Sequence, residues 1–102
     1  FVCAPTPLQH GSLAALDYDM TGFYKDYESK RDRIVDGLRG YYEFVEPGGA
    51  FYIFPKAPYG TATEFVAKAI ANELLIIPGN IFSKRDTHFR ISFAASDETL
   101  DR

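Results

Sequence analysis

The chain has 102 residues, of which 46% are hydrophobic and 25% charged, a composition typical of one globular domain rather than of a disordered segment. The formal net charge of -3 argues against nucleic-acid or anionic-membrane binding, since both need clustered lysine and arginine. No apolar run approaches the roughly 20 residues of a membrane span. Cys3 is the single cysteine, so no intrachain disulfide can form and a cytoplasmic protein is the default expectation.

The first third of the chain predicts two helices. Residues 1–7 hold two prolines and no periodicity, so we expect an extended entry followed by a short helix over about residues 9–16. Over residues 21–38 apolar side chains recur at three- and four-residue steps, which predicts a long amphipathic helix. Gly40 stands where a helix stop is expected.

The middle of the chain predicts a hairpin and a third helix. Residues 41–45 and 50–54 are aromatic-rich, and Pro47-Gly48-Gly49 between them is a turn sequence, so the two segments are expected to pair as adjacent strands. Thr61 and Glu64 have the spacing of a capping box, which predicts a helix from there to about residue 72.

The last third predicts two more strands and the start of a helix. The strands are expected over residues 74–77 and 89–94, and Ser96 is placed as a helix cap. The resulting order of helices and strands indicates an α+β class. The length allows one core, so residues 1–102 are expected to form a single domain, and the abrupt start and stop indicate a fragment of a longer chain.

Arg90 is the best candidate for chemistry. Strand alternation over residues 89–93 puts three apolar side chains on one face and Arg90 with Ser92 on the other. A guanidinium on a stiff strand presents a planar fork of donors to a carboxylate or phosphate. Taken alone, an arginine on the solvated face of a one-sided sheet is the simpler interpretation.

Other patterns of chemistry are weaker. His10 and His88 have no partner motif, so metal ligation and triad chemistry are unsupported. The two turn sequences Pro47-Gly48-Gly49 and Pro78-Gly79-Asn80 lack the spacing of a phosphate-binding loop. Phe51 and Tyr52 could line a pocket, although aromatics on a small hairpin are more often core or cross-strand pairs.

Three segments together are more specific than any of these residues. They are PGGAFYIFP at 47–55, LIIPGNIF at 75–82 and FRISFA at 89–94. Their order and spacing closely resemble the C-terminal domain of class I/II aminotransferases, which are pyridoxal-phosphate enzymes of fold type I such as aspartate aminotransferase. The resemblance spans about the whole chain. It implies a small, three- to four-stranded, mainly antiparallel sheet with helices packed on one face.

The resemblance also implies roles for individual residues. Arg90 falls on the family's arginine that pairs bidentately with the substrate α-carboxylate. Gly49 lies where the small domain of the family meets the active-site entrance, and Tyr52 is a further substrate-side candidate. Gly79 is expected to be structural and Phe82 to be a packing residue, neither binding substrate directly.

The segments that resemble the family do not include the family's catalytic residues. Its Schiff-base lysine and its other cofactor contacts belong to an upstream large domain, and Lys30 and Lys84 lack the surroundings of that lysine's motif. We therefore expect no catalytic, cofactor-binding or metal-binding residue here, and no pyridoxal phosphate bound to the fragment. The expected parent is a homodimeric aminotransferase that moves an amino group between an amino acid and a 2-oxo acid, with this chain packed against its own large domain.

Two alternatives stay open. A fold type I relative that does not transaminate, such as a C–S lyase or a cyclopropane-carboxylate synthase type, would have much the same small domain. An independent α+β ligand-binding or interaction module would use Arg90 only as a surface or structural residue. The sequence does not identify the amino acid and 2-oxo acid, because selectivity in the family comes largely from the large domain and the partner subunit.

Overall fold

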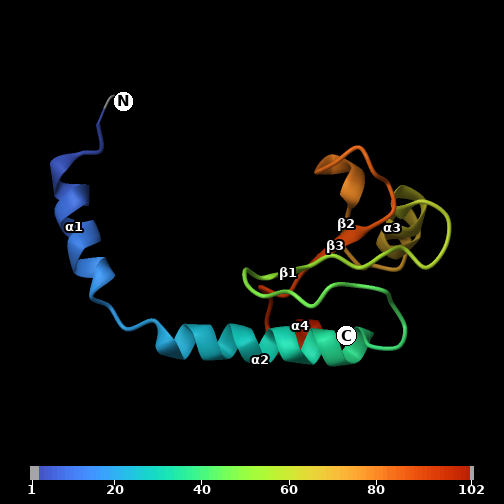
Figure 1. The fold of residues 1–102 in the computed structure, drawn as a ribbon, viewed down its shortest axis with the longest axis horizontal. Helices are drawn as coiled ribbons and strands as arrows, with labels where there is room; N and C mark the ends of the chain where they lie inside the picture. The colour runs from blue at the N-terminus through green and yellow to red at the C-terminus, as the bar shows by residue number, and fades with distance from the viewer. Residues whose placement is uncertain (1–2, 102) are drawn as a thin grey trace.

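The structure is a computed structural model and describes residues 3–101. It is an α+β arrangement with a small antiparallel sheet, as predicted (Figure 1). The elements in chain order are α1 (Thr6–Leu16), α2 (Thr21–Leu38), β1 (Tyr52–Ile53), α3 (Ala62–Ala71), β2 (Ile77–Pro78), the 3₁₀ turn η1 (Gly79–Ile81), β3 (Phe89–Ser92) and α4 (Asp97–Leu100). Helix α1 lies apart from the sheet, α3 packs against β2 and η1, and α4 lies against α2.

The two N-terminal helices are confirmed. Helix α2 has the predicted bounds, and Gly40 beyond its end adopts a φ of 86°, which favours glycine. Helix α1 begins at Thr6, earlier than predicted, because Pro7 sits in the first turn, where its missing N–H leaves no helical bond unmade. Residues 1 and 2 of the predicted entry segment lie outside the described residues. None of the residues of α1 is buried, and α2 buries Val35.

The predicted hairpin is wrong. Residues 41–45 form no strand, and β1 pairs instead with the distant β3. The sheet order is β1-β3-β2 with both pairs antiparallel, so β3 is central. In place of a ladder, residues 41–45 give one backbone bond to the β1 side, from the Lys56 N–H to the Glu43 C=O (2.8 Å). Pairing of β1 with β3 is more favourable than pairing with residues 41–45, because it buries Ile53 and Phe93 in the core, where each is 1% exposed.

The strands are shorter than the apolar runs that predict them. The run 74–77 contributes only its last residue to β2, because the end of α3 holds the preceding residues: the N–H groups of Asn72 and Leu74 both donate to the Ala69 C=O. Leu74 and Leu75 consequently stay 54% and 85% exposed. An apolar run alone therefore does not fix where a strand begins.

Helix α3 packs beside β2 and starts with the predicted capping box. The Thr61 hydroxyl accepts from the Glu64 N–H (3.2 Å), and the Glu64 carboxylate accepts from the Thr61 N–H (3.0 Å), which lowers the pKa of Glu64 below its ordinary value. The core where α3 meets β2 and β3 consists of Ala62, Val66, Ile76 and Phe89, with Tyr42, Phe65 and Ile91 packed against it.

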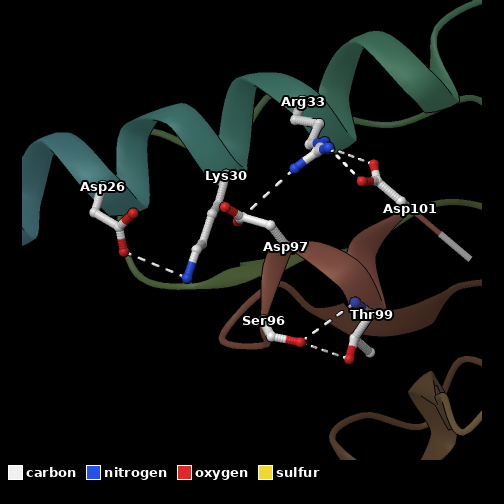
Figure 2. A network of polar contacts seen from close by, with 7 residues as sticks. All are labelled: Asp26, Lys30, Arg33, Ser96, Asp97, Thr99 and Asp101. Carbon is white, nitrogen blue, oxygen red and sulfur yellow. Dashed lines mark hydrogen bonds and ion pairs between the residues drawn. The ribbon is translucent and has the colours of Figure 1, made fainter.

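Polar contacts attach the C-terminal segment to α2 (Figure 2). The Arg33 guanidinium donates to the Asp101 carboxylate at 2.6 Å and lies 3.8 Å from Asp97. Ser96 caps α4 as predicted, accepting from the Thr99 N–H at 3.3 Å. Among residues 3–101, no helix is long and apolar enough to cross a lipid bilayer.

Candidate functional site

The candidate site is centred on Arg90, which is partly buried on the central strand. The alternation predicted for this strand is confirmed at its ends, since Phe89 and Phe93 are 2% and 1% exposed. The guanidinium carbon lies over two aromatic rings, 4.3 Å from the centroid of Tyr52 and 4.4 Å from the centroid of Phe82. Both distances are within the range of a cation–π contact.

The register of the sheet explains the position of Tyr52. Tyr52 pairs with Ser92, and Ser92 lies two residues from Arg90 on the same face of β3. Tyr52 is therefore a diagonal cross-strand neighbour of Arg90, a separation that an aromatic ring and a long side chain can bridge. Tyr52 therefore contacts Arg90, and its role toward a substrate stays a prediction.

Phe82 reaches Arg90 from the other side of β3, through the turn η1 that directly follows β2. The Phe82 N–H donates to the Gly79 C=O at 2.9 Å and closes this turn. The Gly79 N–H in turn donates to the His88 C=O at 2.7 Å, next to the start of β3. Phe82 is 51% exposed, and its ring packs on the Arg90 guanidinium, outside the buried core.

Gly79 has the structural role that the sequence predicts. A Cβ at this position would lie 2.5 Å from the His88 carbonyl oxygen and 2.9 Å from Cζ of Phe54. Any other residue would therefore push η1 away from β3, and η1 carries the chain to Phe82.

The charge of Arg90 has no acidic partner among residues 3–101. Three other arginines, namely Arg31, Arg33 and Arg39, form ion pairs with carboxylates. No ion pair or hydrogen bond of the Arg90 guanidinium occurs in the described part of the chain. Its N–H fork is consequently available to an anion, and a carboxylate can accept two parallel bonds from it.

Gly49 lies elsewhere. It is exposed in the loop before β1 and borders a hollow of about 250 Å³ whose other lining residues are Tyr24, Tyr27, Glu28, Arg31, Gly48 and Ala50. Phe51 links this side of the loop to the candidate site, with ring centroids 6.1 Å from Tyr27 and 4.5 Å from Tyr52. The structure thus brings Tyr52 and Phe82 to Arg90 and leaves Gly49 beside α2.

A second hollow was not predicted from the sequence. It has a volume of about 450 Å³ at the junction of α1 and α2 and is lined by Tyr18, Asp19, Gly22, Phe23 and Asp26. The Thr21 hydroxyl and N–H stabilise the Asp19 carboxylate and lower its pKa. Residues 3–101 contain no group of three side chains placed to hold a metal ion.

The structure is thus a small α+β domain whose central strand carries an arginine with no acidic partner among residues 3–101. The sequence model of the family described as aminotransferase class I and II matches residues 1–102, and the chain belongs to that family.

Several relatives are similar to the whole chain. It is 35% identical over 107 aligned residues to a probable aspartate aminotransferase of Methanocaldococcus jannaschii, covering all of this chain and 28% of the relative. It is 32% identical over 100 residues to the aspartate aminotransferase of Thermotoga maritima, covering 96% of this chain and 26% of the relative. The chain therefore spans little more than a quarter of the curated relatives that it matches.

Solved structures have the same fold. The crystal structure of the Thermotoga maritima aspartate aminotransferase superimposes with a TM-score of 0.86 at 31% identity, covering 97% of this chain and 26% of that one. A Methanococcus jannaschii structure, described as similar in its active site to kynurenine aminotransferases, has a TM-score of 0.87 at 27% identity, covering 99% of this chain and 29% of that one.

The family implies pyridoxal phosphate as the cofactor of the full-length enzyme. These two hollows do not fit it, because neither is lined by a lysine that could carry the cofactor's aldehyde. The Lys30 ammonium lies 3.3 Å from the Asp26 carboxylate and the Lys56 ammonium lies 2.8 Å from the Glu43 carboxylate, so both lysines are engaged in ion pairs. No step of the chemistry is therefore assigned to a cofactor held by these residues.

Proposed function

We propose that this chain is the C-terminal domain of a pyridoxal-phosphate-dependent aminotransferase and that Arg90 binds the α-carboxylate of the substrate. The full-length enzyme would transfer an amino group between an amino acid and a 2-oxo acid. The observation that carries the proposal is the Arg90 guanidinium, which is held by two rings and has its donors unpaired in the described part of the chain. Membership of the aminotransferase family supports it.

The role of Arg90 is to orient the amino acid. Two parallel N–H···O bonds fix a carboxylate in the plane of the guanidinium, which a lysine cannot do. Fixing the carboxylate restricts the directions of the bonds at Cα, and this positioning lowers the entropic part of the barrier. The cofactor, bound by residues outside this chain, supplies the electron sink for the reaction.

The remainder of the enzyme is expected to cover the N-terminal helices. Large apolar side chains of α1 and α2 are exposed, including Leu13 (61%), Leu16 (81%), Phe23 (53%) and Tyr24 (64%). We propose that residues 1–102 form one domain that packs here against the large domain of its own chain or against the second subunit of a cytoplasmic homodimer. Gly49, exposed and with open space around its Cα, is the secondary candidate for a contact at that entrance.

The test uses the full-length enzyme and the variant Arg90→Ala. We expect the KM of the best amino-acid substrate to rise by about one to two orders of magnitude, while the cofactor absorbance is unchanged. L-aspartate is the first amino acid to assay, because both curated relatives above are described as aspartate aminotransferases. Arg85→Ala removes a neighbouring exposed arginine and is the matched control. An unchanged KM in Arg90→Ala would contradict the proposal.

The same assay addresses a fold type I enzyme that does not transaminate. In an aminotransferase the amino acid leaves as its 2-oxo acid and its nitrogen stays on the enzyme, whereas a lyase or synthase releases a different product. Detection, in a single turnover, of the 2-oxo acid that keeps the complete side chain of the amino acid, without release of ammonia, therefore decides between the two reactions.

A further inference from the structure

We propose that Tyr52 and Phe82 are positioning residues that hold the Arg90 guanidinium ready for a carboxylate; together they are termed the aromatic clamp. The inference rests on the proposed function, since it concerns the same arginine. It assigns to Phe82 and Tyr52 a role through Arg90, whether or not either ring touches the substrate.

The two rings flank the guanidinium from different parts of the fold. Tyr52 belongs to β1 and Phe82 follows η1 and β2, and these segments lie on opposite sides of the central strand that carries Arg90. The guanidinium carbon is nearly equidistant from the two ring centroids, at 4.3 Å and 4.4 Å. A cation over two ring faces keeps its N–H groups at its edge, because cation–π attraction uses the ring faces and no hydrogen-bond donor.

The rings of Tyr52 and Phe82 carry no net charge, so the positive charge of Arg90 is not neutralised and can attract an anionic ligand. Arg33 is held instead by carboxylates, with Asp101 at 2.6 Å, and such a partner occupies donors and offsets the positive charge. Aromatic rings restrict an arginine side chain without either effect. The rotamer entropy of a long side chain is then lost on folding and is not lost again when the substrate binds.

The clamp is connected to the core by η1. Asn80 in this turn donates from Nδ2 to the Thr63 hydroxyl at 2.9 Å, and the Thr63 N–H is bound by Asp86 at 3.0 Å. Helix α3 therefore fixes the loop that presents Phe82. The Phe82 ring, which lies outside the buried core cluster, makes its contact with the Arg90 guanidinium.

The first experiment measures amino-acid binding to full-length Phe82→Leu in a single turnover followed by cofactor absorbance. The probe is whichever of L-aspartate, L-alanine and L-phenylalanine reacts fastest with the wild type. We expect the apparent dissociation constant to rise about threefold to thirtyfold, the range of one cation–π contact, while the spectrum of the free enzyme is unchanged. Phe82→Tyr keeps a ring and is expected to stay within about twofold of the wild type.

The matched control is Tyr59→Leu. Tyr59 is 49% exposed and forms a cation–π contact with Lys68 at 4.8 Å, so it reproduces the exposure and the chemistry of Phe82 away from Arg90. The amino-acid dissociation constant of this variant should equal that of the wild type. An effect as large as that of Phe82→Leu would overturn the clamp.

A double-mutant cycle separates positioning from general structural damage. If Phe82 acts through Arg90, Phe82→Leu should change binding by less than about twofold when Arg90→Lys is already present. An equal factor in both backgrounds would overturn the clamp. Arg90→Lys without any effect would mean that the proposed function is wrong, whereas a large effect of Arg90→Lys with a silent Phe82→Leu would mean that only the clamp is wrong.

A chemical readout independent of catalysis completes the test. Phenylglyoxal modifies accessible guanidinium groups, and mass spectrometry reports the rate at each arginine. We expect Arg90 to be modified faster in full-length Phe82→Leu and in Tyr52→Leu than in the wild type, with Arg85 unchanged as the internal reference. Equal rates at Arg90 in all three proteins would overturn the clamp.

Discussion

The backbone N–H of Gly79 donates to the carbonyl oxygen of His88 over 2.7 Å, and this contact holds η1 against the residue preceding β3. The two backbones approach so closely that a Cβ on residue 79 would lie 2.5 Å from the same oxygen. The glycine is thus what allows the turn to carry Phe82 to Arg90.

We expect Gly79→Ala to lower the free energy of unfolding by about 1–3 kcal/mol, the usual cost of overpacking. It should also weaken amino-acid binding in the full-length enzyme, since η1 must move. Urea denaturation measures the first effect. Gly37→Ala is the control, because a Cβ there meets nothing within 4 Å and alanine favours a helix, so this variant should be neutral or more stable. Equal stability of the two variants would contradict the close contact.

The capping box gives a second prediction. Thr61→Ala removes the oxygen that accepts the Glu64 N–H at the start of α3 and should cost about 1 kcal/mol in urea denaturation. Thr61→Ser keeps the oxygen and should recover most of that loss. A Thr61→Ala variant as stable as the wild type would show that the cap contributes nothing.

The lowered pKa of Glu64 predicts a pH dependence. Its carboxylate accepts the Thr61 N–H in the folded state, so its folded pKa lies below the ordinary value of 4.5. A group with a depressed folded pKa stabilises the fold fully above its unfolded pKa, and this contribution is lost as the pH falls through the folded pKa. In Glu64→Gln, urea midpoints should therefore fall less steeply than in the wild type below about pH 4.5. Identical slopes for both proteins would contradict the assignment.

The contacts between α2 and α4 predict a local effect of salt and mutation. Arg33, Asp97 and Asp101 are all substantially exposed, so Arg33→Ala should lower global stability by less than about 1 kcal/mol. Hydrogen exchange of the α4 amides should nevertheless become faster, both in this variant and in the wild type at high salt. Arg39→Ala, which affects only pairs near the end of α2, is the control. Unchanged exchange in α4 would mean that the ion pairs do not hold it.

The parts of this fold that depend on neighbouring residues were predictable. The bounds of α2, the capping box at Thr61 and the Ser96 cap follow from periodicity and from side chains that bond to nearby amides. The pairing of the strands depends on distant residues: the segment 41–45 has the composition of a strand, but β1 gains more by pairing with β3.

The candidate site, like the fold, was predicted only where it depends on neighbouring residues. Alternation put Arg90 on the open face of its strand, and the resemblance to the family gave it a role. Phe82 could not be recognised as its neighbour, because their contact needs the close approach at Gly79, which no periodicity describes. A glycine next to a turn proline, followed three residues later by an exposed aromatic, is the only local signal of that approach.

The most direct measurement of the central claim removes the carboxylate from the substrate. Full-length wild-type enzyme and Arg90→Ala would each be titrated with an amino acid that reacts and with its α-amide, which lacks the charged group. If Arg90 binds the α-carboxylate, the wild type should prefer the acid by about hundredfold and Arg90→Ala should lose nearly all of that preference. The same preference in both proteins would contradict the role of Arg90.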